Sequence, residues 1–305
     1  MKDPTSTSVN PFNEDAQDEA AAKRAAVDAA ALGFVRQLAK DLAHGEFDLP
    51  PFPDTPLRVQ ECIRDPNSDI HALAAIVATE PALAARLMRM ANSAMMRRGP
   101  IEVTDIPTAI SRVGMDMVQN AAVSFAGREA FKAPSGSPCI DDLNQLRRRS
   151  VMVGSLAYLL ARHVRAIRKA DEAMLAGLLS NVGKLYIVMK AADHPELFVD
   201  REALDRLVAQ WHTGVARAIV ESWGCPEAIA IAVDEQEIRE RERLAPADLS
   251  DLLFVANLVA RAGNKAAEAL GELDALARMR LTGEQLAGIL EEGEEELESM
   301  VAAMS

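Results

Sequence analysis

Residues 175–187 read LAGLLSNVGKLYI, an aliphatic segment that is interrupted at its centre by Ser-Asn and then by Gly-Lys. It lies within a stretch from Asp171 to about Met189 that predicts one helix. No segment of the chain shows the sustained alternation of apolar and polar residues that is typical of a half-buried strand. The sequence therefore predicts an all-α fold.

The helical pattern continues on both sides of this segment. Upstream, Asp141 or Asp142 is expected to cap a helix with one apolar stripe. The members of that stripe are Leu143, Leu146, Ser150, Val153, Ala157, Leu160 and Val164. Downstream, residues 201–222 and 226–242 predict two further helices, which are separated by Trp-Gly-Cys-Pro.

Prolines and charge runs set the expected boundaries. Residues 1–17 are polar and predict a disordered tail, and residues 18–48 predict an amphipathic helix with a connector. Residues 49–262 predict the main domain, a helical bundle with shorter helices before a linker near 132–140 and longer ones after it. Residues 263–305 predict an acidic helical extension.

The composition limits the class of protein. The chain has 305 residues, of which 49% are hydrophobic, so it can bury a sizeable core. Aromatic residues make up only 4%, which indicates an aliphatic core and favours helices. The net charge of −13 would repel a phosphate backbone, so we expect no nucleic-acid partner.

The cysteines and the chain start indicate the compartment. Cys62, Cys139 and Cys225 are far apart and form no CxxC pair, which is typical of reduced thiols. The first twenty residues contain no apolar stretch, so no secretory signal is expected. No segment reaches the uninterrupted apolar length that spans a bilayer, so we expect a cytoplasmic protein without membrane insertion.

Several motifs in the same order resemble the HDOD family, the HD-related output domains of bacterial signalling proteins. The resemblance covers about Leu49 to Arg261. Its motifs are LPPFPDTPLRVQECIRDPNSDI (49–70), EPALAARLMRMANSA (80–94), DIPTAISRVGMD (105–116), LAGLLSNVGKLYI (175–187) and WHTGVARAIVESWGCPEAIAIAV (211–233). The resemblance implies a helical bundle of two subdomains, with a short-helix N-terminal part and an HD-like C-terminal part.

The resemblance also implies where an HD phosphohydrolase would hold its metal. The first His position falls on Arg149, the His-Asp pair on Ser180 and Asn181, and the later Asp on or near Asn257. These are poor metal ligands, and the guanidinium of Arg149 carries only donors and a fixed positive charge. We therefore expect a pseudo-phosphohydrolase with no metal, no cofactor and no catalytic residue.

Other residues are candidates for ligand or partner contacts. Gly183-Lys184 fails the P-loop pattern, because Leu178 and Leu185 occupy positions that require Gly and Ser or Thr. His212 is more often a structural histidine in such a setting than a ligand. A methionine-rich stretch around the 80–94 motif would suit an adaptable protein-binding surface if it is exposed. The possible contacts are Arg149, Lys184, His212, Asn92, Met95 and Met96.

Three functions remain open at this point. The preferred hypothesis is a non-catalytic signal-transduction regulator that binds other signalling proteins in trans. The first alternative is a sensor that binds a nucleotide or another anion through Arg149 and its neighbours. The second is a residual metal-dependent phosphohydrolase, which the loss of the metal ligands argues against.

Overall fold

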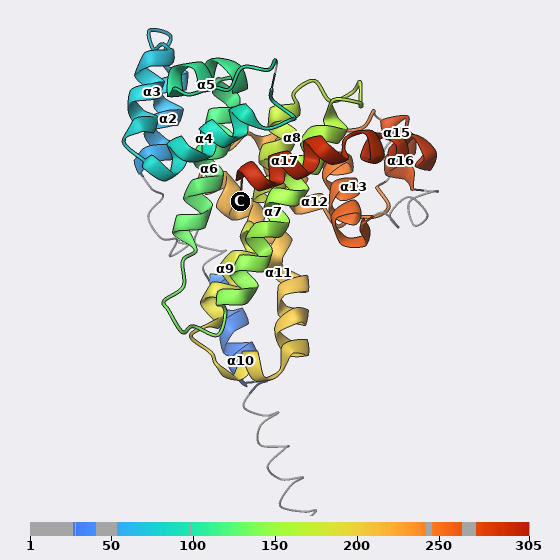
Figure 1. Ribbon diagram of the computed structural model, residues 1–305. Helices are drawn as coiled ribbons and strands as arrows, with labels where there is room; N and C mark the ends of the chain where they lie inside the picture. The colour runs from blue at the N-terminus through green and yellow to red at the C-terminus, as the bar shows by residue number, and fades with distance from the viewer. Residues whose placement is uncertain are drawn as a thin grey trace, which may run out of the picture.

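The computed structural model describes residues 27, 29–40, 54–97, 99–241, 246–263 and 273–304. Within these ranges the regular structure is helical and contains no strand, so the all-α prediction is confirmed (Figure 1). The predicted tail at 1–17 and the connector that ends at residue 48 lie outside the described residues. Of the helix predicted within 18–48, residues 29–40 are described and helical, and Phe34 and Leu38 are buried.

Short helices form the N-terminal part of the bundle. They are α2 (Asp54–Arg64), α3 (Ile70–Ala78), α4 (Pro81–Asn92), α5 (Ile106–Val113) and α6 (Met115–Ala130). The carboxylates of Asp69 and Asp105 each accept a backbone N–H in the first turn of the following helix, which fixes the starts of α3 and α5. Val59, Leu87, Met117 and their neighbours bury a core of their own between these helices.

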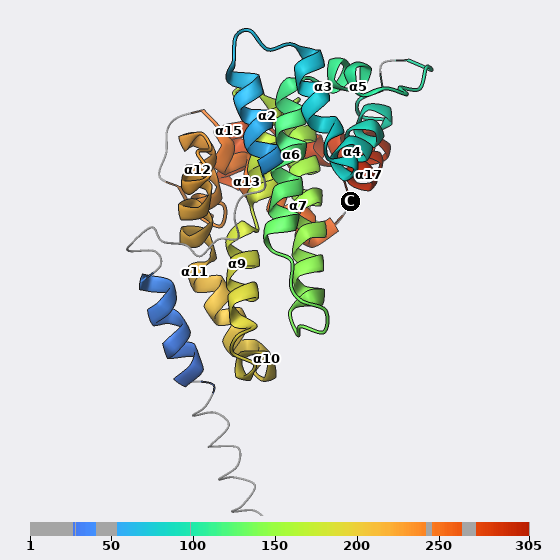
Figure 2. The same ribbon diagram turned by 90° about the vertical axis from the view of Figure 1, so that its left-hand side faces the viewer.

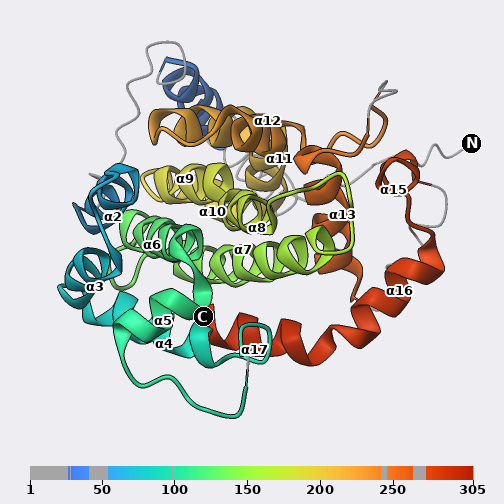
Figure 3. The ribbon, with the colours of Figure 1, turned by 90° about the horizontal axis from the view of Figure 1, so that it is seen from above.

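The rest of the bundle contains the two longest described helices, of 22 residues each, together with several short ones. They are α7 (Ile140–Ala161), α8 (Ala170–Leu179), α9 (Val182–Ala191), α10 (Glu196–Val199), α11 (Arg201–Ser222), α12 (Glu227–Glu235) and α13 (Leu249–Ala262). The C-terminal extension adds α15 (Asp274–Met279), α16 (Gly283–Glu292) and α17 (Glu294–Met304). Helix α7 runs through the middle of the molecule, with α8 and α9 on one side and α4 and α17 on the other (Figure 3).

Helix α7 belongs to both cores of the protein. Val151 packs into the N-terminal core, while Val153 and Leu156 pack into the larger C-terminal core. Helix α8 divides in the same way, with Leu178 in the first core and Leu179 in the second. The α7–α8 pair is therefore the shared wall of the bundle, although nothing in this packing tests the domain boundaries predicted at 49 and 262.

Helix α17 crosses α7 and closes the N-terminal core (Figure 1). Met300 and Met304 are fully buried there among residues of α2 to α6. The Ser299 hydroxyl accepts the backbone N–H of Ala94 at 2.8 Å, and Arg89 donates to the carbonyl oxygen of Ala303 at 3.2 Å. The acidic extension thus contributes core side chains as well as surface charge.

Two glycine contacts set the spacing of the central helices. Gly177 on α8 lies so close to Gly154 on α7 that a Cβ atom at Gly177 would come 2.5 Å from the Gly154 Cα. A Cβ at Gly183 on α9 would overlap the carbonyl oxygen of His212 on α11. A side chain at either position would force the helices apart.

The structure corrects several predicted helix limits. The stretch from Asp171 to Met189 is two helices, α8 and α9, because the chain turns at Ser180–Asn181. The helix predicted over 226–242 ends at Glu235 as α12. Asp141 and Asp142 do not cap α7, because the N-cap is Cys139. Both aspartates lie in the first helical turn, where their negative charges interact favourably with the helix dipole.

The segment Ala170–Ala191 is long and apolar enough to cross a membrane by length and composition. However, 83% of its apolar window is buried inside the protein. The segment includes α8 and α9, whose apolar side chains pack in the core of the bundle. Its hydrophobicity is therefore accounted for by the fold itself.

We expect Gly177→Ala to lower the free energy of unfolding by about 1–3 kcal/mol, because the new methyl group overpacks the α7–α8 contact. The matched control is Gly214→Ala in the middle of α11, where a Cβ meets nothing within 4 Å. That change should stabilise the protein by about 0.5–1 kcal/mol through helix propensity. Urea unfolding of both variants measures the difference, and two effects of equal sign would contradict the packing argument.

Candidate functional site

The candidate site is organised by three consecutive residues at the end of α12. Glu235 is the last residue of the helix, and Gln236 and Glu237 form the turn that follows. Glu235 joins a network of ion pairs with Arg241, Gln236 enters the core, and Glu237 faces a group of cations. The helix end therefore sends three neighbouring side chains into three different environments.

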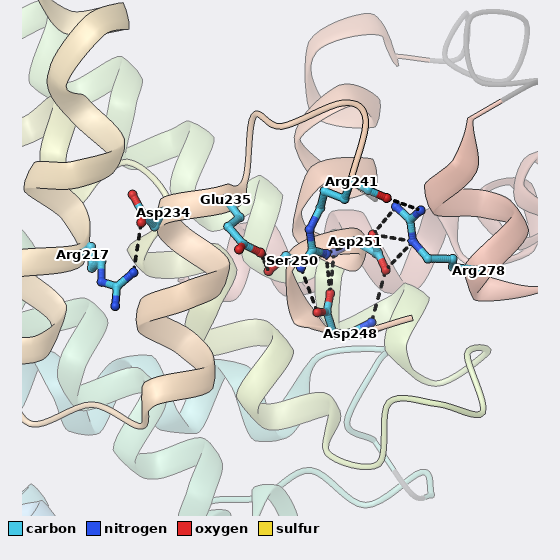
Figure 4. Close-up of polar contacts among 8 residues, drawn as sticks. All are labelled: Arg217, Asp234, Glu235, Arg241, Asp248, Ser250, Asp251 and Arg278. Carbon is cyan, nitrogen blue, oxygen red and sulfur yellow. Dashed lines mark hydrogen bonds and ion pairs between the residues drawn. The ribbon is translucent and has the colours of Figure 1, made fainter. Parts of the chain in front are cut away.

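Glu235 belongs to the ion-pair network shown in Figure 4. Arg241 contacts Glu235 at 2.5 Å and Asp248 at 2.8 Å, and it also reaches Asp251 at 3.1 Å. Arg278 on α15 donates to both oxygens of Asp251, at 2.7 Å and 3.1 Å. Because Asp251 is only 1% exposed, this carboxylate depends on its two arginines, and the network ties α15 to the start of α13.

Gln236 connects the positions that the resemblance assigned to a metal. Its amide nitrogen donates to the carbonyl oxygen of Ser180 at 2.9 Å, and its amide oxygen accepts from Asn257 at 3.0 Å. The amide nitrogen of Asn181 donates to the hydroxyls of Ser180 and Ser150, both at 3.2 Å. These five residues, which we call the buried polar chain, are each no more than 6% exposed.

The buried polar chain does not fit a divalent metal ion. Its side chains offer only hydroxyl and carboxamide groups, and these are directed at one another. An HD-type centre needs imidazole and carboxylate ligands with free lone pairs. Nor do three His, Cys, Asp or Glu side chains gather into a possible metal site anywhere among the residues that the structure describes.

Glu237 is the shared partner of two cations and a histidine. Its Oε1 atom lies 2.7 Å from Arg261, 3.1 Å from Lys184 and 3.2 Å from Nε2 of His212. These contacts bring α9, α11 and α13 together at the turn after α12. We call Lys184, His212, Glu237 and Arg261 the Glu237 cluster.

The cluster shifts the pKa of its members in directions that follow from burial and charge. Contact with the His212 ring, aided by the charge of Lys184, holds the pKa of the Glu237 carboxyl far below its usual range. Burial lowers the pKa of His212, which is only 1% exposed, so the neutral ring is favoured. Burial also lowers the pKa of the Lys184 ammonium, against the attraction of Glu237.

Arg149 lies next to this cluster without sharing its hydrogen bonds. Its Nε and Nη2 atoms are buried and have no hydrogen-bond partner in the described part of the chain. Desolvation lowers the pKa of its guanidinium, the charge of Arg261 lowers it further, and Glu237 opposes both. Arg149 and Lys184 line a cavity of about 470 Å³ between α7, α9 and α11.

The structure separates the predicted site residues into two groups. Ser180, Asn181 and Asn257 join the buried polar chain, but Arg149 makes no hydrogen bond to any of them within the described residues. Arg149 instead lines the neighbouring cavity with Lys184, which contacts Glu237 beside His212. Within the described residues Arg149 forms no ion pair with Asp142, Glu172 or Asp234, which pair instead with Arg201, Lys169 and Arg217.

The predicted contacts around the 80–94 motif are largely used inside the protein. Asn92 donates to the carbonyl oxygen of Val103 at 2.9 Å and accepts its N–H at 2.8 Å, which holds the loop before α5. Met96 is 8% exposed and packs in the N-terminal core, while Met95 is half-buried beside it. Of the two methionines, only Met95 offers appreciable surface to a partner.

Sequence reasoning missed four residues that define the site: Ser150, Gln236, Glu237 and Arg261. Gln236 and Glu237 lie in the charged run DEQEIRERER, which is typical of a solvated helix face. Ser150 belonged to a predicted core stripe and gave no sign of a polar partner. Gln236 and Glu237 turn inward only because α12 ends at Glu235, and no local sequence signal marks that end.

Comparison with known proteins places the fold in a family. Residues 49–238 match the HDOD domain family. A Shewanella amazonensis protein, provisionally assigned as a metal-dependent phosphohydrolase, is 26% identical and superimposes with a TM-score of 0.76, over 91% of this chain and 100% of that one. A Marinobacter aquaeolei protein, provisionally assigned to signal transduction, is 22% identical with a TM-score of 0.62, over 93% of this chain and 66% of that one.

One curated relative is longer than this chain. An uncharacterized protein of Treponema pallidum is 23% identical over 205 residues, which is 63% of this chain. The match covers only 38% of that relative's own length. What the longer protein does as a whole therefore carries no conclusion about this chain.

Gln236→Met should lower the free energy of unfolding by about 1–3 kcal/mol, because it leaves the Ser180 carbonyl oxygen and the Asn257 amide buried without a partner. Asn257→Leu alone should have a similar effect. The double variant should cost less than the sum of the two, since both partners of one hydrogen bond are removed together. A double-mutant cycle by urea unfolding measures this coupling, and strict additivity would contradict the buried polar chain.

The depressed pKa of His212 predicts a pH dependence of stability. The unfolded chain takes up a proton near the ordinary histidine pKa of about 6.5, whereas the folded protein resists it. Stability should therefore be full above that pH and fall as the pH is lowered from 7 to 5. Denaturant unfolding across this range measures the slope. His212→Gln should reduce the slope of stability against pH by the equivalent of up to one bound proton. An unchanged slope would be evidence against a neutral buried His212.

Proposed function

The chain belongs to the HDOD domain family, and we propose that it is a non-catalytic signalling regulator that acts by binding other proteins. The family match covers residues 49–238, which is more than half of the chain. A signalling role is consistent with this family and with the fold shared with the Marinobacter aquaeolei protein. The partners are signalling proteins that act in trans.

The buried polar chain carries the proposal that the protein is not an enzyme. Ser180, Asn181 and Asn257 occupy the positions where the family resemblance would place metal ligands, and each is hydrogen-bonded inside the core. To reach a cation, these groups would have to give up those bonds and would still offer no negative charge. Without a metal, the buried polar chain cannot activate a water molecule for attack on a phosphate ester.

The remaining polar groups do not replace the metal as a catalyst. Neutral His212 lies beside Glu237, but the same carboxylate contacts Lys184 and Arg261 and is held ionised. None of these contacts joins a base to a serine or cysteine nucleophile, which general-base catalysis of that type requires. The arrangement is suited to holding helices together and to presenting charge.

A hydrolase assay tests the catalytic part of the proposal. The purified full chain, supplied in turn with Mg²⁺, Mn²⁺, Fe²⁺ and Ni²⁺, should release no nitrophenol above background from p-nitrophenyl phosphate or its diester. Metal analysis after gel filtration should find no retained transition metal. Hydrolysis that requires added metal and disappears in Asn181→Ala would contradict the proposal.

An interaction experiment tests the regulatory part. Affinity purification of the full chain from its native cells, followed by cross-linking and mass spectrometry, should recover a signalling protein in stoichiometric amount. Met95→Glu, at the end of the molecule that carries α4, should weaken its recovery, whereas Val199→Glu on the distant α10 should not (Figure 1). Absence of any stoichiometric partner would contradict the proposed function.

A further inference from the structure

The Glu237 cluster and Arg149 contain more positive charge than the nearby carboxylate can balance. The charge of Arg261 lowers the pKa of both Arg149 and Lys184, and the charge of Arg149 also lowers the pKa of Lys184, so the three cations lie close together. Among the residues that the structure describes, Glu237 is the carboxylate that pairs with Lys184 and Arg261, and the same Oε1 atom makes both contacts. Since burial favours neutral His212, the group holds an excess of about two positive charges.

The unpartnered atoms of Arg149 match the shape of an anion. Nε and Nη2 form one edge of the guanidinium, where two N–H bonds run parallel and can bind two oxygens of one group. These atoms are buried without a hydrogen bond in the described part of the chain, which is an unfavourable state for a charged donor. Arg149 already lines the neighbouring cavity, and binding of an anion there requires rotation about the last side-chain torsions, which turns this buried edge toward it.

The cavity has room for more than an inorganic ion. Its volume of about 470 Å³ lies within the range of small-molecule sites. Lys184 on α9 lines the cavity together with Arg149 on α7, while Leu146, Met152, Val188 and Val208 supply an apolar surface. Figure 2 shows α7, α9 and α11, which carry these residues, running side by side in the lower part of the molecule.

Two acidic residues, Asp142 and Asp205, also line the cavity. Asp142 forms a two-pronged pair with Arg201 at 2.8 Å, so its charge is already balanced. Asp205 remains close to that pair. Arg148 lines the cavity as well, so its positive charge is carried by Arg148, Arg149 and Lys184, while Asp205 adds a negative charge beside the Asp142–Arg201 pair.

We propose that this cavity binds a small phosphomonoester of about nucleotide size, with its phosphate on Arg149 and Lys184 and its organic part on the apolar wall. A phosphomonoester carries a charge of about −1.5 to −2 at neutral pH, which matches the excess charge of the cluster. In the ligand-free protein Lys184 pairs with Glu237, so the phosphate has to compete with this carboxylate for the lysine. The site stands independently of the proposed regulatory function, because a chain that binds no phosphomonoester could still recruit a protein partner.

Isothermal titration of the full chain with adenosine monophosphate, in a buffer free of phosphate, tests this site. Saturable binding should appear with a rise in melting temperature. Adenosine, which lacks only the phosphate, should give neither. Arg149→Met should weaken binding by about ten- to hundredfold, because it removes two charged hydrogen bonds. Arg206→Met, an exposed change on α11, should leave the affinity unchanged.

Two further variants separate binding from a structural role. Ligand-free Arg149→Met should melt no lower than the unaltered chain, since it removes buried nitrogens that lack partners. Glu237→Gln should tighten binding by removing the competing carboxylate. If Arg149→Met does not fold, Lys184→Met provides the same affinity test from α9.

Four results would overturn the proposal. They are no saturable heat with adenosine monophosphate at 10 mM, equal binding of adenosine, unchanged affinity in the Arg149 or Lys184 variant, or a lower melting temperature of ligand-free Arg149→Met. The last would show that Arg149 already has partners in the folded protein. Binding of inorganic phosphate alone, with no gain from the nucleoside part, would likewise overturn the assignment of the apolar wall.

Discussion

Helix α12 ends at Glu235, and the turn that follows determines what the centre of this protein contains. Continued as a helix, residues 235–237 would point in directions about 100° apart on one cylinder. The turn instead directs Gln236 into the core, where it joins Ser180 to Asn257, and leaves Glu237 facing the cations of α9 and α13. Glu235, one residue earlier, holds Arg241 in the network that reaches α15 (Figure 4).

This turn is matched by a second interruption at Ser180–Asn181, between α8 and α9. A chain that leaves a helix inside a core exposes backbone groups that need partners. Here the carbonyl oxygen of Ser180 accepts a hydrogen bond from Gln236. A side chain from the turn after α12 therefore satisfies a backbone group that the turn between α8 and α9 leaves free. The glycines on either side make the arrangement sterically possible, since Gly177 lets α8 lie against α7 and Gly183 lets α9 lie against α11.

Sequence patterns predicted the helical class and most helix positions, because apolar spacing and proline positions are local signals, while the family was indicated by the resemblance of whole motifs. They did not predict the two interruptions. The run around Ser180 is apolar on both sides, and the run around Gln236 is charged, so each is typical of an uninterrupted helix. Arg149 and Glu237 illustrate the same limit: they are 88 positions apart in the sequence, and their proximity depends on how α7, α12 and the turn pack.

The polar residues of this centre fall into two groups: the buried polar chain, whose members hydrogen-bond to one another, and Arg149, whose buried nitrogens Nε and Nη2 have no hydrogen-bond partner in the described residues. The buried polar chain pairs hydroxyls and amides with one another, and a neutral group paired in this way is tolerated in a core. Arg149 does not join this chain: in the described part of the protein its buried Nε and Nη2 atoms have no hydrogen-bond partner. An unpaired buried donor costs about 1–3 kcal/mol, which is a large share of the total stability of about 5–15 kcal/mol that is typical of a domain. The position that the family resemblance assigns to the first metal ligand is thus occupied here by a guanidinium, and the group that would satisfy it carries the opposite charge to a metal.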